Sequence, residues 1–402
     1  MKILVINAGS SSIKYQLLDM DDESLMASGI VERIGEAQGE LSHKKFVNGN
    51  EEKTVIEKKI GNHRDGMHLL IDMITSAETG VIASTDEIDA IGHRVVQGGE
   101  LFNSATLIDK SVKQAIEENN PLAPLHNPAN LTGIAVAEEL FPGTPNVAVF
   151  DTEFHQTMPA RAYMYALPYE FYEDLKVRRY GFHGTSHKYV AKNVAGAMNR
   201  KPEDINVITI HLVNGGSITA VKGGECIDTS MGMTPLAGVM MGSRCGDIDP
   251  AISGYIAEAK NISAAEVDSI LNKKSGFKGI CGMNDMRDIH ESAAGGNQRA
   301  RLAVDMFCYQ VKKYIGAYFA ALGTVDAIAF TAGIGENDDI VRAGVCSDME
   351  GLGLELDPAA NDGRISHQKK ISKDGGKVEI WVIPTNEELQ IAQDTIDVVK
   401  GN

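Results

Sequence analysis

Three short stretches rich in glycine and hydroxyl side chains follow apolar, strand-like runs, and their composition suits phosphate binding. They are Asn7–Ser12, Asn214–Ser217 and Thr331–Asn337. Glycine lets backbone N–H groups approach phosphate oxygens closely, and hydroxyl groups add further donors. None is a P-loop, because GxxxxGK[ST] does not occur, and Gly333-Ile334-Gly335 lacks the third glycine of a dinucleotide fingerprint. One such turn is typical of an ordinary hairpin, but three in one chain favour a nucleotide held between two domains.

The composition limits the classes of protein to which this chain can belong. Its 402 residues are enough for two domains, and 43% hydrophobic with 23% charged residues is typical of a globular protein. The formal net charge of −17 argues against a nucleic-acid-binding surface, which would have to be basic. The five cysteines form no CxxC pair, which indicates reduced thiols without a disulfide framework or a zinc site.

The N-terminal segment enters a strand-like run at once and has no signal-peptide pattern. No apolar run approaches the ~20 residues that a membrane span requires. We therefore expect a cytoplasmic protein that has neither nucleic acid nor membrane as a partner.

Short apolar runs alternate with helical patterns along the chain, which favours an α/β architecture. Strands are expected at Ile3–Ile6, Ile13–Leu18, Ile88–Ile91, Val147–Phe150, Val207–Ile210, Ile218–Val221, Ala327–Phe330 and Val378–Ile383. Helices are expected at Asp65–Ile74, Asn130–Glu139, Ser186–Met198, Asp249–Ala259 and Arg299–Ala321.

One segment of the chain has an internal counterpart. The opening VINAGSSSIKYQLLD is similar to ITIHLVNGGSITAVKGG about two hundred residues later, with Ser12-Ile13 in register with Ser217-Ile218. Copies so far apart indicate two domains of one topology rather than a solenoid, whose period would be about 20–50 residues. We place one domain at residues 1–150 plus 386–402, and the other at residues 151–385. The last helix would then return to the first domain.

Longer strings resemble the acetate kinase (acetokinase) family, in order and over the whole length. They are VINAGSSSIKY, GHRVVQGG, LAPLHNPANL, FDTEFHQTMP, RRYGFHGTSHKYV, HLVNGGS, DTSMGMTPLAGVMMGSRCGDIDP, FTAGIGEN and TNEE. The family belongs to the superfamily of sugar kinases, actin and heat-shock chaperones. The resemblance implies an α/β fold of two duplicated ribonuclease-H-like (βββαβαβα) domains, with an active-site cleft between them. Two positions depart from the family pattern: Val213 replaces the first glycine of HLGNG, and Gln97 changes VVHGG to VVQGG.

The activity that the resemblance implies is reversible transfer of the γ-phosphoryl group of ATP to acetate, giving acetyl phosphate and ADP. Acetate is already an anion at neutral pH, so no general base is needed. Like charges repel instead, and catalysis must consist of positioning and charge neutralisation. Arginine suits this task because it stays protonated and binds oxyanions bidentately.

The resemblance assigns Arg94, Asp151, His183 and Arg244 to catalysis. The two arginines would bind the reacting anions, and His183 would donate a hydrogen bond to the transferring phosphoryl group. Because acetate carries no proton to remove, we expect Asp151 to position a metal ion and its waters, although its family role is sometimes described as acid/base.

The metal ion would be Mg²⁺, with Mn²⁺ as an alternative, and Glu387 and Asn7 would bind it. Mg²⁺ keeps several waters, so two protein oxygens are sufficient. Glu387 is equally typical of a carboxylate in the first turn of a helix. The i, i+4 spacing of His183 and His187 would also suit a metal, but no HExxH pattern supports one, and a core or capping role for His187 is the alternative.

The remaining residues form two groups. The nucleotide-binding group is Ser12, Lys14, His211, Leu212, Val213, Asn214, Gly215, Asp285, Met286, Arg287, Gly333, Ile334, Gly335, Glu336 and Asn337. The acetate-binding group is Arg94, Val96, Leu125, His126, Phe182 and Pro235. A small apolar pocket discriminates chain length by only ~1–3 kcal/mol per methylene, so propionate is expected as a slower substrate.

Two alternatives remain beside an acetate kinase. One is a propionate or butyrate kinase of the same fold, which only pocket volume would distinguish. The other is a non-catalytic ATPase switch, which predicts an appended peptide-binding region and no paired arginines. We expect no such region, and we expect the two arginines to act as a pair. The resemblance also implies a homodimer.

Overall fold

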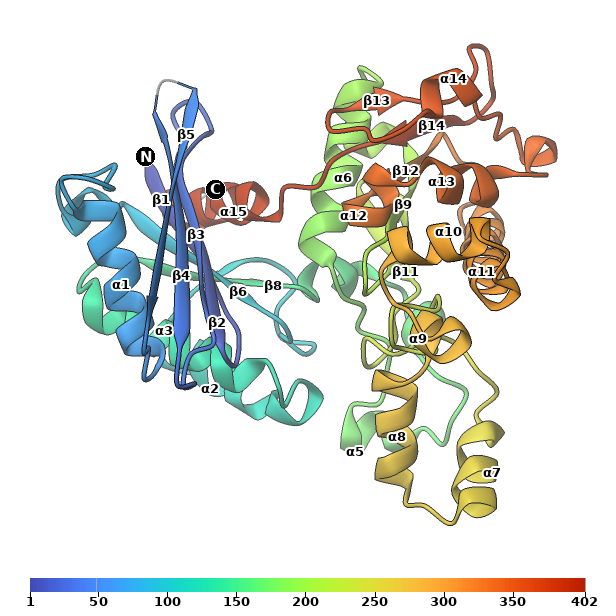
Figure 1. Ribbon diagram of the computed structural model, residues 1–402, viewed down its shortest axis with the longest axis horizontal. Coiled ribbons are helices and arrows are strands. Elements are labelled where there is room, and N and C mark those ends of the chain that lie inside the picture. The colour runs from blue at the N-terminus through green and yellow to red at the C-terminus, as the bar shows by residue number, and fades with distance from the viewer. Residues whose placement is uncertain (48, 402) are drawn as a thin grey trace. The chain divides into compact units, whose positions relative to one another are not determined.

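The computed structural model describes residues 1–47 and 49–401, and the chain divides into two compact units (Figure 1). The first consists of Met1–Phe154 with Asn386–Asn402, and the second of His155–Thr385. Within the described residues, no helix is both long and apolar enough to cross a membrane. All five cysteines lie in the described part of the chain and are free thiols.

The first unit contains one mixed sheet of eight strands. They are β1 (Lys2–Ala8), β2 (Ser12–Asp19), β3 (Ser24–Glu32), β4 (Gly39–Val47), β5 (Asn50–Lys58), β6 (Ala90–Val95), β7 (Thr106–Leu107) and β8 (Asn146–Phe150). Their order across the sheet is β5-β4-β3-β2-β1-β6-β8-β7. The strands β1 to β5 pair antiparallel, whereas β1, β6 and β8 are parallel neighbours.

Helices cover both faces of this sheet. They are α1 (His63–Thr75), α2 (Lys110–Glu118), α3 (Asn127–Leu140) and α15 (Glu387–Lys400). Alternate residues of β1 bury in different clusters: Leu4 and Ile6 pack with residues of α1 and α3, and Ile3 and Val5 pack with residues of α15. This alternation with period two explains why the whole strand is apolar. Figure 1 shows α15, the last helix of the chain, beside β1, the first strand.

The second unit contains a six-stranded sheet. Its strands are β9 (Asn206–His211), β10 (Ser217–Lys222), β11 (Glu225–Thr229), β12 (Ala327–Thr331), β13 (Lys369–Lys370) and β14 (Glu379–Val382), in the order β11-β10-β9-β12-β14-β13. The order and direction of β11-β10-β9-β12-β14 repeat those of β3-β2-β1-β6-β8 in the first unit. The predicted α/β fold of two duplicated ribonuclease-H-like units is confirmed.

The second unit contains eleven helices within the described residues, of which α6 and α11 cover the two faces of its sheet. They are α4 (Ala160–Tyr163), α5 (Glu170–Leu175), α6 (Gly184–Ala197), α7 (Ala251–Lys260), α8 (Ala264–Lys273), α9 (Gly276–Cys281), α10 (Met286–Ala294), α11 (Gln298–Leu322), α12 (Ala332–Asn337), α13 (Asp339–Cys346) and α14 (Pro358–Asn361). Apolar residues of α11 pack with Ile208 and Phe330, whereas α6 packs with Val207 and Ala329 on the opposite face. The helix α6, which precedes β9 in the chain, therefore covers one face of the second sheet.

Two predicted turns differ from the structure. The strand β1 extends to Ala8 and β2 begins at Ser12, so the opening turn comprises only residues 9–11 instead of six residues. Gly9 N donates to Ser12 O at 2.8 Å, which closes this short turn. The stretch Thr331–Asn337 is mainly the short helix α12 rather than a turn. The strand expected at Ile88–Ile91 is β6, which continues to Val95 and therefore contains Arg94.

Candidate active site

Arg94 and Asp151 lie on neighbouring parallel strands of the first unit. Arg94 is near the end of β6, opposite Val149 of β8, and Asp151 directly follows β8. Carboxyl ends of parallel strands are the usual place for binding residues in α/β proteins. Arg94 Nε donates to Asp151 Oδ1 at 2.8 Å and Nη2 donates to Oδ2 at 2.5 Å. The Asp151 charge raises the pKa of Arg94, so the guanidinium stays protonated.

Two buried asparagines of α3 hold the strand ends around this pair. Asn130 Nδ2 donates to Ala8 O at 2.8 Å, and Asn130 Oδ1 accepts from Val96 N at 3.2 Å. One side chain therefore joins the end of β1 to the end of β6. Asn127 binds both backbone groups of Gln97. Both asparagines belong to the string LAPLHNPANL, which indicated the family, but sequence reasoning gave neither of them a role.

Gln97, which departs from the family pattern, is fully buried. Its Oε1 accepts from Gly99 N at 3.0 Å, and its Nε2 has no hydrogen-bond partner among the described residues. The substitution thus shapes the turn after β6 without touching the Arg94–Asp151 pair.

Glu387 is the first residue of α15, whose N-cap Asn386 accepts from Leu389 N at 3.1 Å. The pKa of the half-buried Glu387 is raised to about 7, chiefly by burial and in part by the charge of Asp151, whereas Arg94 and Lys14 lower it. A carboxylate that is costly to ionise would be stabilised by a divalent cation. Asn7 lies opposite Lys14 in the β1–β2 register and can add an amide oxygen. These hard oxygen donors fit Mg²⁺.

His183 has a backbone conformation that is uncommon for a residue with a side chain. It precedes α6 as its N-cap with φ 57°, in the left-handed region. Such conformations persist only where the surroundings enforce them, often at functional sites. The imidazole stacks on His211, with ring centroids 4.3 Å apart, and its Nδ1 lies 2.9 Å from Ser217 Oγ. This places His183 next to the second of the three predicted phosphate turns.

Arg244 contacts the same turn from another segment. A Cβ added to Gly215 would lie 3.2 Å from Arg244 Nη1, so only glycine leaves room for the guanidinium at its present distance. Arg244 Nη1 donates to Pro235 O at 3.3 Å, and burial lowers the pKa of the side chain. No carboxylate is recorded as its partner within residues 1–47 and 49–401. Unlike Arg94, this cation has no compensating carboxylate among the residues that the structure describes.

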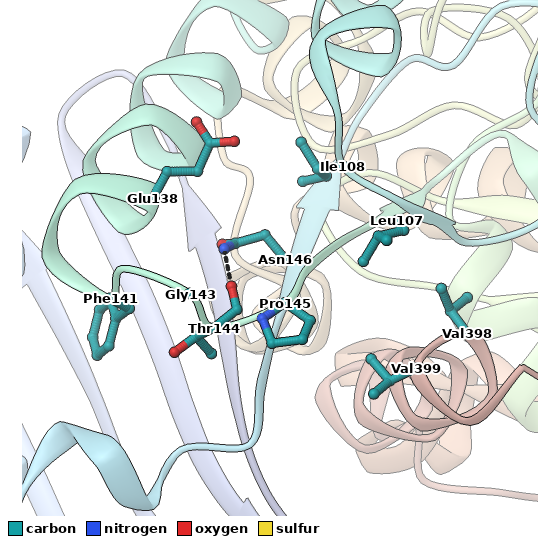
Figure 2. A pocket seen from close by; sticks show the side chains of 10 residues that line it. All are labelled: Leu107, Ile108, Glu138, Phe141, Gly143, Thr144, Pro145, Asn146, Val398 and Val399. Atoms are coloured by element: carbon teal, nitrogen blue, oxygen red, sulfur yellow. Dashed lines mark hydrogen bonds between the residues drawn. The ribbon is translucent and has the colours of Figure 1, made fainter.

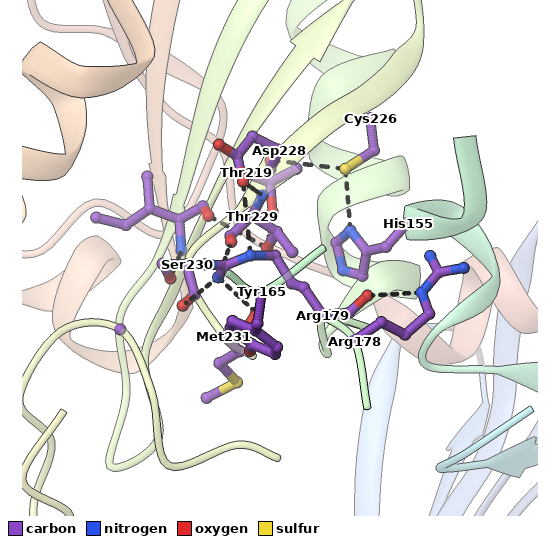
Figure 3. Close-up of polar contacts among 12 residues, drawn as sticks. His155, Tyr165, Arg178, Arg179, Thr219, Cys226, Asp228, Thr229, Ser230 and Met231 are labelled. Atoms are coloured by element: carbon purple, nitrogen blue, oxygen red, sulfur yellow. Dashed lines mark hydrogen bonds and ion pairs between the residues drawn. The ribbon is translucent and has the colours of Figure 1, made fainter. Parts of the chain in front are cut away.

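Arg179 fixes the segment that leads to Arg244. Figure 3 shows its guanidinium pointing at the backbone after β11. Its Nη1 donates to the carbonyls of Thr229, Ser230 and Met231 at 2.7, 3.0 and 3.1 Å. Sequence reasoning missed this residue, although it lies in the quoted string RRYGFHGTSHKYV.

A hollow of about 780 Å³ in the second unit contains many of the predicted nucleotide-binding residues. Val213, Asn214, Asp285, Met286, Arg287, Gly333, Ile334 and Asn337 line it, together with the unpredicted Asn284, His290, Asp338, Asp339, Ile340 and Arg364. This volume suits a cofactor-sized ligand. Val213 is partly exposed there, and a Cβ on Gly333 would lie 3.5 Å from its Cγ2.

Five predicted nucleotide-binding residues of the second unit do not line this hollow: His211, Leu212, Gly215, Gly335 and Glu336. Leu212 is a buried core residue, and the carboxylate of Glu336 accepts from Ala332 N and Thr385 N at 2.8 and 3.2 Å. Ser12 and Lys14 belong to β2 of the first unit.

The predicted acetate-binding residues divide between the units. Val96 is buried, Leu125 is 71% exposed and His126 is the N-cap of α3, all in the first unit. In the second unit Phe182 is buried, and Pro235 is half-buried beside Arg244.

A different hollow, of about 480 Å³, lies in the first unit at the opposite end of β8 (Figure 2). Its polar side chains are engaged elsewhere: Asn146 bonds His93 Nε2 at 2.7 Å, and Glu138 pairs with Lys113 at 2.7 Å. None of the predicted site residues lines it, and we do not assign it to the active site.

The repeated core topology, with glycine turns beside arginine and histidine, defines a duplicated ribonuclease-H-like protein with sites suited to phosphate. A model of the acetokinase family matches residues 2–393, and the chain belongs to this family. It is 58% identical to the acetate kinase of Nitratidesulfovibrio vulgaris (strain DP4), over the full length of both chains.

Two solved structures are also similar. The Porphyromonas gingivalis acetate kinase shares 45% identity at a TM-score of 0.95, and 99% of each chain is covered. A propionate kinase from Francisella tularensis shares 41% identity at a TM-score of 0.91, again covering 99% of each chain.

Proposed function

We propose that this protein is an acetate kinase that transfers the γ-phosphoryl group of ATP reversibly to acetate, giving acetyl phosphate and ADP. The observation that carries the proposal is Arg244, a half-buried cation against Gly215 that has no carboxylate partner in the described part of the chain. Such a cation beside a glycine turn is suited to bind an anionic phosphoryl group. Full-length similarity to proteins named acetate kinase supports the same conclusion.

In the forward reaction, a carboxylate oxygen of acetate forms a bond to the γ-phosphorus. The bond from that phosphorus to the β–γ bridging oxygen breaks, and ADP leaves with the electron pair. No proton moves, so the protein has to align the two anions and neutralise their charge. Arg244 and Arg94 supply N–H donors to the oxygens, and His183 donates a ring N–H to the transferring group.

Asp151 has a more specific role in this proposal than the one predicted from sequence. Both of its carboxylate oxygens accept from Arg94, so it orients the guanidinium and leaves Nη1 to bind the substrate carboxylate. Contact with the waters of a metal ion can accompany this role. An acid/base role is unnecessary because acetate has no proton to lose.

Glu387 and Asn7 would hold Mg²⁺, or Mn²⁺ in its place, through one carboxylate and one amide oxygen. When bound, the ion neutralises charge on the β- and γ-phosphate oxygens. The nucleotide itself is proposed to occupy the hollow lined by Val213, Asp285 and Gly333, with Val213 restricting the space above Gly333. Lys14 and Ser12 of the first unit would contact phosphate.

The test is acyl phosphate formation from ATP with acetate, propionate or butyrate, detected as hydroxamate, beside a reaction without acid. We expect the highest kcat/KM with acetate and a lower value with propionate. Equal ATP turnover without any acid would contradict a kinase and support an ATPase switch. A preference for propionate would favour the second candidate, which similarity to the Francisella tularensis propionate kinase keeps open.

We further infer a cytoplasmic homodimer and a two-domain organisation that follows the two units. The five free thiols are consistent with a reducing compartment. The dimer rests on the family resemblance, and sedimentation equilibrium tests it directly.

A further inference from the structure

A chain of buried polar side chains leads from His183 into the core of the second unit. His183 Nδ1 lies 2.9 Å from Ser217 Oγ, which lies 2.7 Å from His187 Nε2. On the other side of the ring, His187 Nδ1 lies 2.7 Å from Thr209 Oγ1. Ser217, His187 and Thr209 are each 0% exposed, so no solvent can replace these bonds.

The direction of donation along this chain has two alternatives. In the first, Thr209 donates to His187 Nδ1, His187 Nε2–H donates to Ser217, and Ser217 donates to His183 Nδ1. His183 then carries its proton on Nε2. In the second, every donor is reversed: His183 Nδ1–H donates to Ser217, and the proton on Nε2 is absent.

The geometry at Thr209 favours the first direction. In the reversed chain Thr209 would accept from His187 and would have to send its own proton to Thr219 O, which is 3.5 Å away. A hydrogen bond of that length is weak, whereas the bond to His187 is 2.7 Å long. A third arrangement, in which both rings donate to Ser217, would leave the serine proton without an acceptor among the described residues.

Either direction of donation requires a neutral His187, because an imidazolium would donate from both nitrogens. Its complete burial lowers its pKa well below the usual range, and the neighbouring rings of His155 and His211 lower it further. These rings lie with centroids 5.7 and 6.1 Å from that of His187. A neutral His187 has one ring proton, and its position fixes the direction of the chain.

We propose that Thr209, His187 and Ser217 are positioning residues that hold His183 in the tautomer with its proton on Nε2. His183 is then a neutral hydrogen-bond donor. The opposite tautomer would present a lone pair at Nε2, which would repel an anionic oxygen. This inference rests on the proposed function in one respect only, namely that His183 donates to the phosphoryl group.

The test is ¹⁵N NMR of the histidine-labelled full-length protein, which distinguishes protonated from unprotonated ring nitrogens. In the unmodified protein we expect His183 to show Nε2 protonated and Nδ1 as an acceptor. In Ser217→Ala we expect shifts averaged between the two tautomers. We also expect kcat to fall about 3- to 10-fold, the equivalent of one lost hydrogen bond, with KM for ATP and acetate unchanged.

Thr209→Val provides a second variant, which removes the terminal donor while nearly conserving volume and touches neither His183 nor substrate. Ser217→Thr should restore the single tautomer. Ser372→Ala is the matched control, because its buried hydroxyl has no hydrogen-bond partner in the described residues. A protonated Nδ1 in the unmodified protein would overturn the inference, as would one unchanged tautomer in both Ser217→Ala and Thr209→Val.

The proposed function has a separate readout. If His183→Ala leaves acetyl phosphate formation unchanged, the role of His183 in transfer is wrong, whereas the tautomer measurement still decides whether the buried chain orients the ring.

Discussion

Arg94 and Asp151, 57 residues apart in sequence, form a bidentate ion pair with Nε–Oδ1 at 2.8 Å and Nη2–Oδ2 at 2.5 Å. The side chain of Asp151 is 3% exposed, whereas the side chain of Arg94 keeps 25% of its surface accessible. The pair therefore presents one face of a fixed guanidinium. In contrast, Arg244 lies against a glycine turn without such a partner among the described residues. One arginine is held by its ion pair, and the charge of the other is available to a ligand.

Asp151→Asn should leave Arg94 in place but without a matched acceptor. The amide can accept only through its oxygen, and its NH₂ group faces an arginine donor. Breaking one side of a buried pair costs about 3–5 kcal/mol, so we expect kcat/KM for acetate to fall by about 10²-fold or more. Steady-state kinetics check this result. Activity within twofold of the unmodified enzyme would show that Arg94 needs no orienting carboxylate.

Arg244→Gln should act mainly on kcat. The lost donor would stabilise charge that develops in the transition state, and removal of such a donor costs about 3–4 kcal/mol, or 10²- to 10³-fold. Arg33→Gln is the control, because Arg33 is an exposed residue that pairs with Glu40 at 2.9 Å. If Arg94 and Arg244 can both be made neutral with little loss of acyl phosphate synthesis, the charge-neutralisation mechanism is wrong.

Arg342 should stabilise backbone segments that border the nucleotide hollow. Within the described part of the chain, this fully buried cation donates to five oxygens, none of which belongs to a carboxylate. They are Asn361 Oδ1, Asn361 O, Gly335 O, Glu336 O and Gly363 O, at 2.6, 2.7, 3.0, 3.1 and 2.8 Å. Arg342→Met would leave those oxygens without donors. We expect KM for ATP to rise several-fold and Tm to fall, while KM for acetate stays unchanged.

The companion change Arg342→Lys keeps the charge but supplies only three donors. Its Tm and its KM for ATP should lie between those of the unmodified protein and those of Arg342→Met. Parallel increases in the KM values of ATP and acetate would instead indicate general loosening of the protein.

Stability should decrease in mild acid because of His93. Burial lowers the pKa of this ring to about 4, and it bonds Asn146 Oδ1 at 2.7 Å. The unfolded chain takes up the proton near pH 6.5 and the folded chain only near pH 4. The free energy of unfolding is therefore unaffected by His93 above about pH 6.5. It decreases as the pH falls towards 4, and the total loss is about 3 kcal/mol.

Urea unfolding between pH 7.5 and 4.5 measures this effect. In His93→Gln, whose side-chain amide can donate to Asn146 but does not titrate, the slope of stability against pH should be smaller in that interval. An identical slope in the two proteins would assign the acid sensitivity to other groups.

Several features followed from the order of residues alone. The continuous apolar runs of β1 and β8 identified buried strands, because this signal is local. The similarity of the two strand–turn–strand segments predicted the duplication that the two sheets show. The strand β5 was missed because most of its residues are exposed and it carries no clear apolar period.

Only the tertiary structure decided how these parts act together. Asn130 joins the ends of β1 and β6, and Arg342 donates hydrogen bonds to carbonyl groups up to 21 residues away in sequence. The direction of hydrogen-bond donation towards His183 depends on two distances at Thr209, to His187 Nδ1 and to Thr219 O. Thr209 lies on β9, and no local sequence pattern relates this strand to His183. Such contacts join residues whose separation along the chain says nothing of their distance in space. The order of residues along the chain therefore determines which segments become strands and helices, whereas the order of strands in each sheet determines which side chains meet.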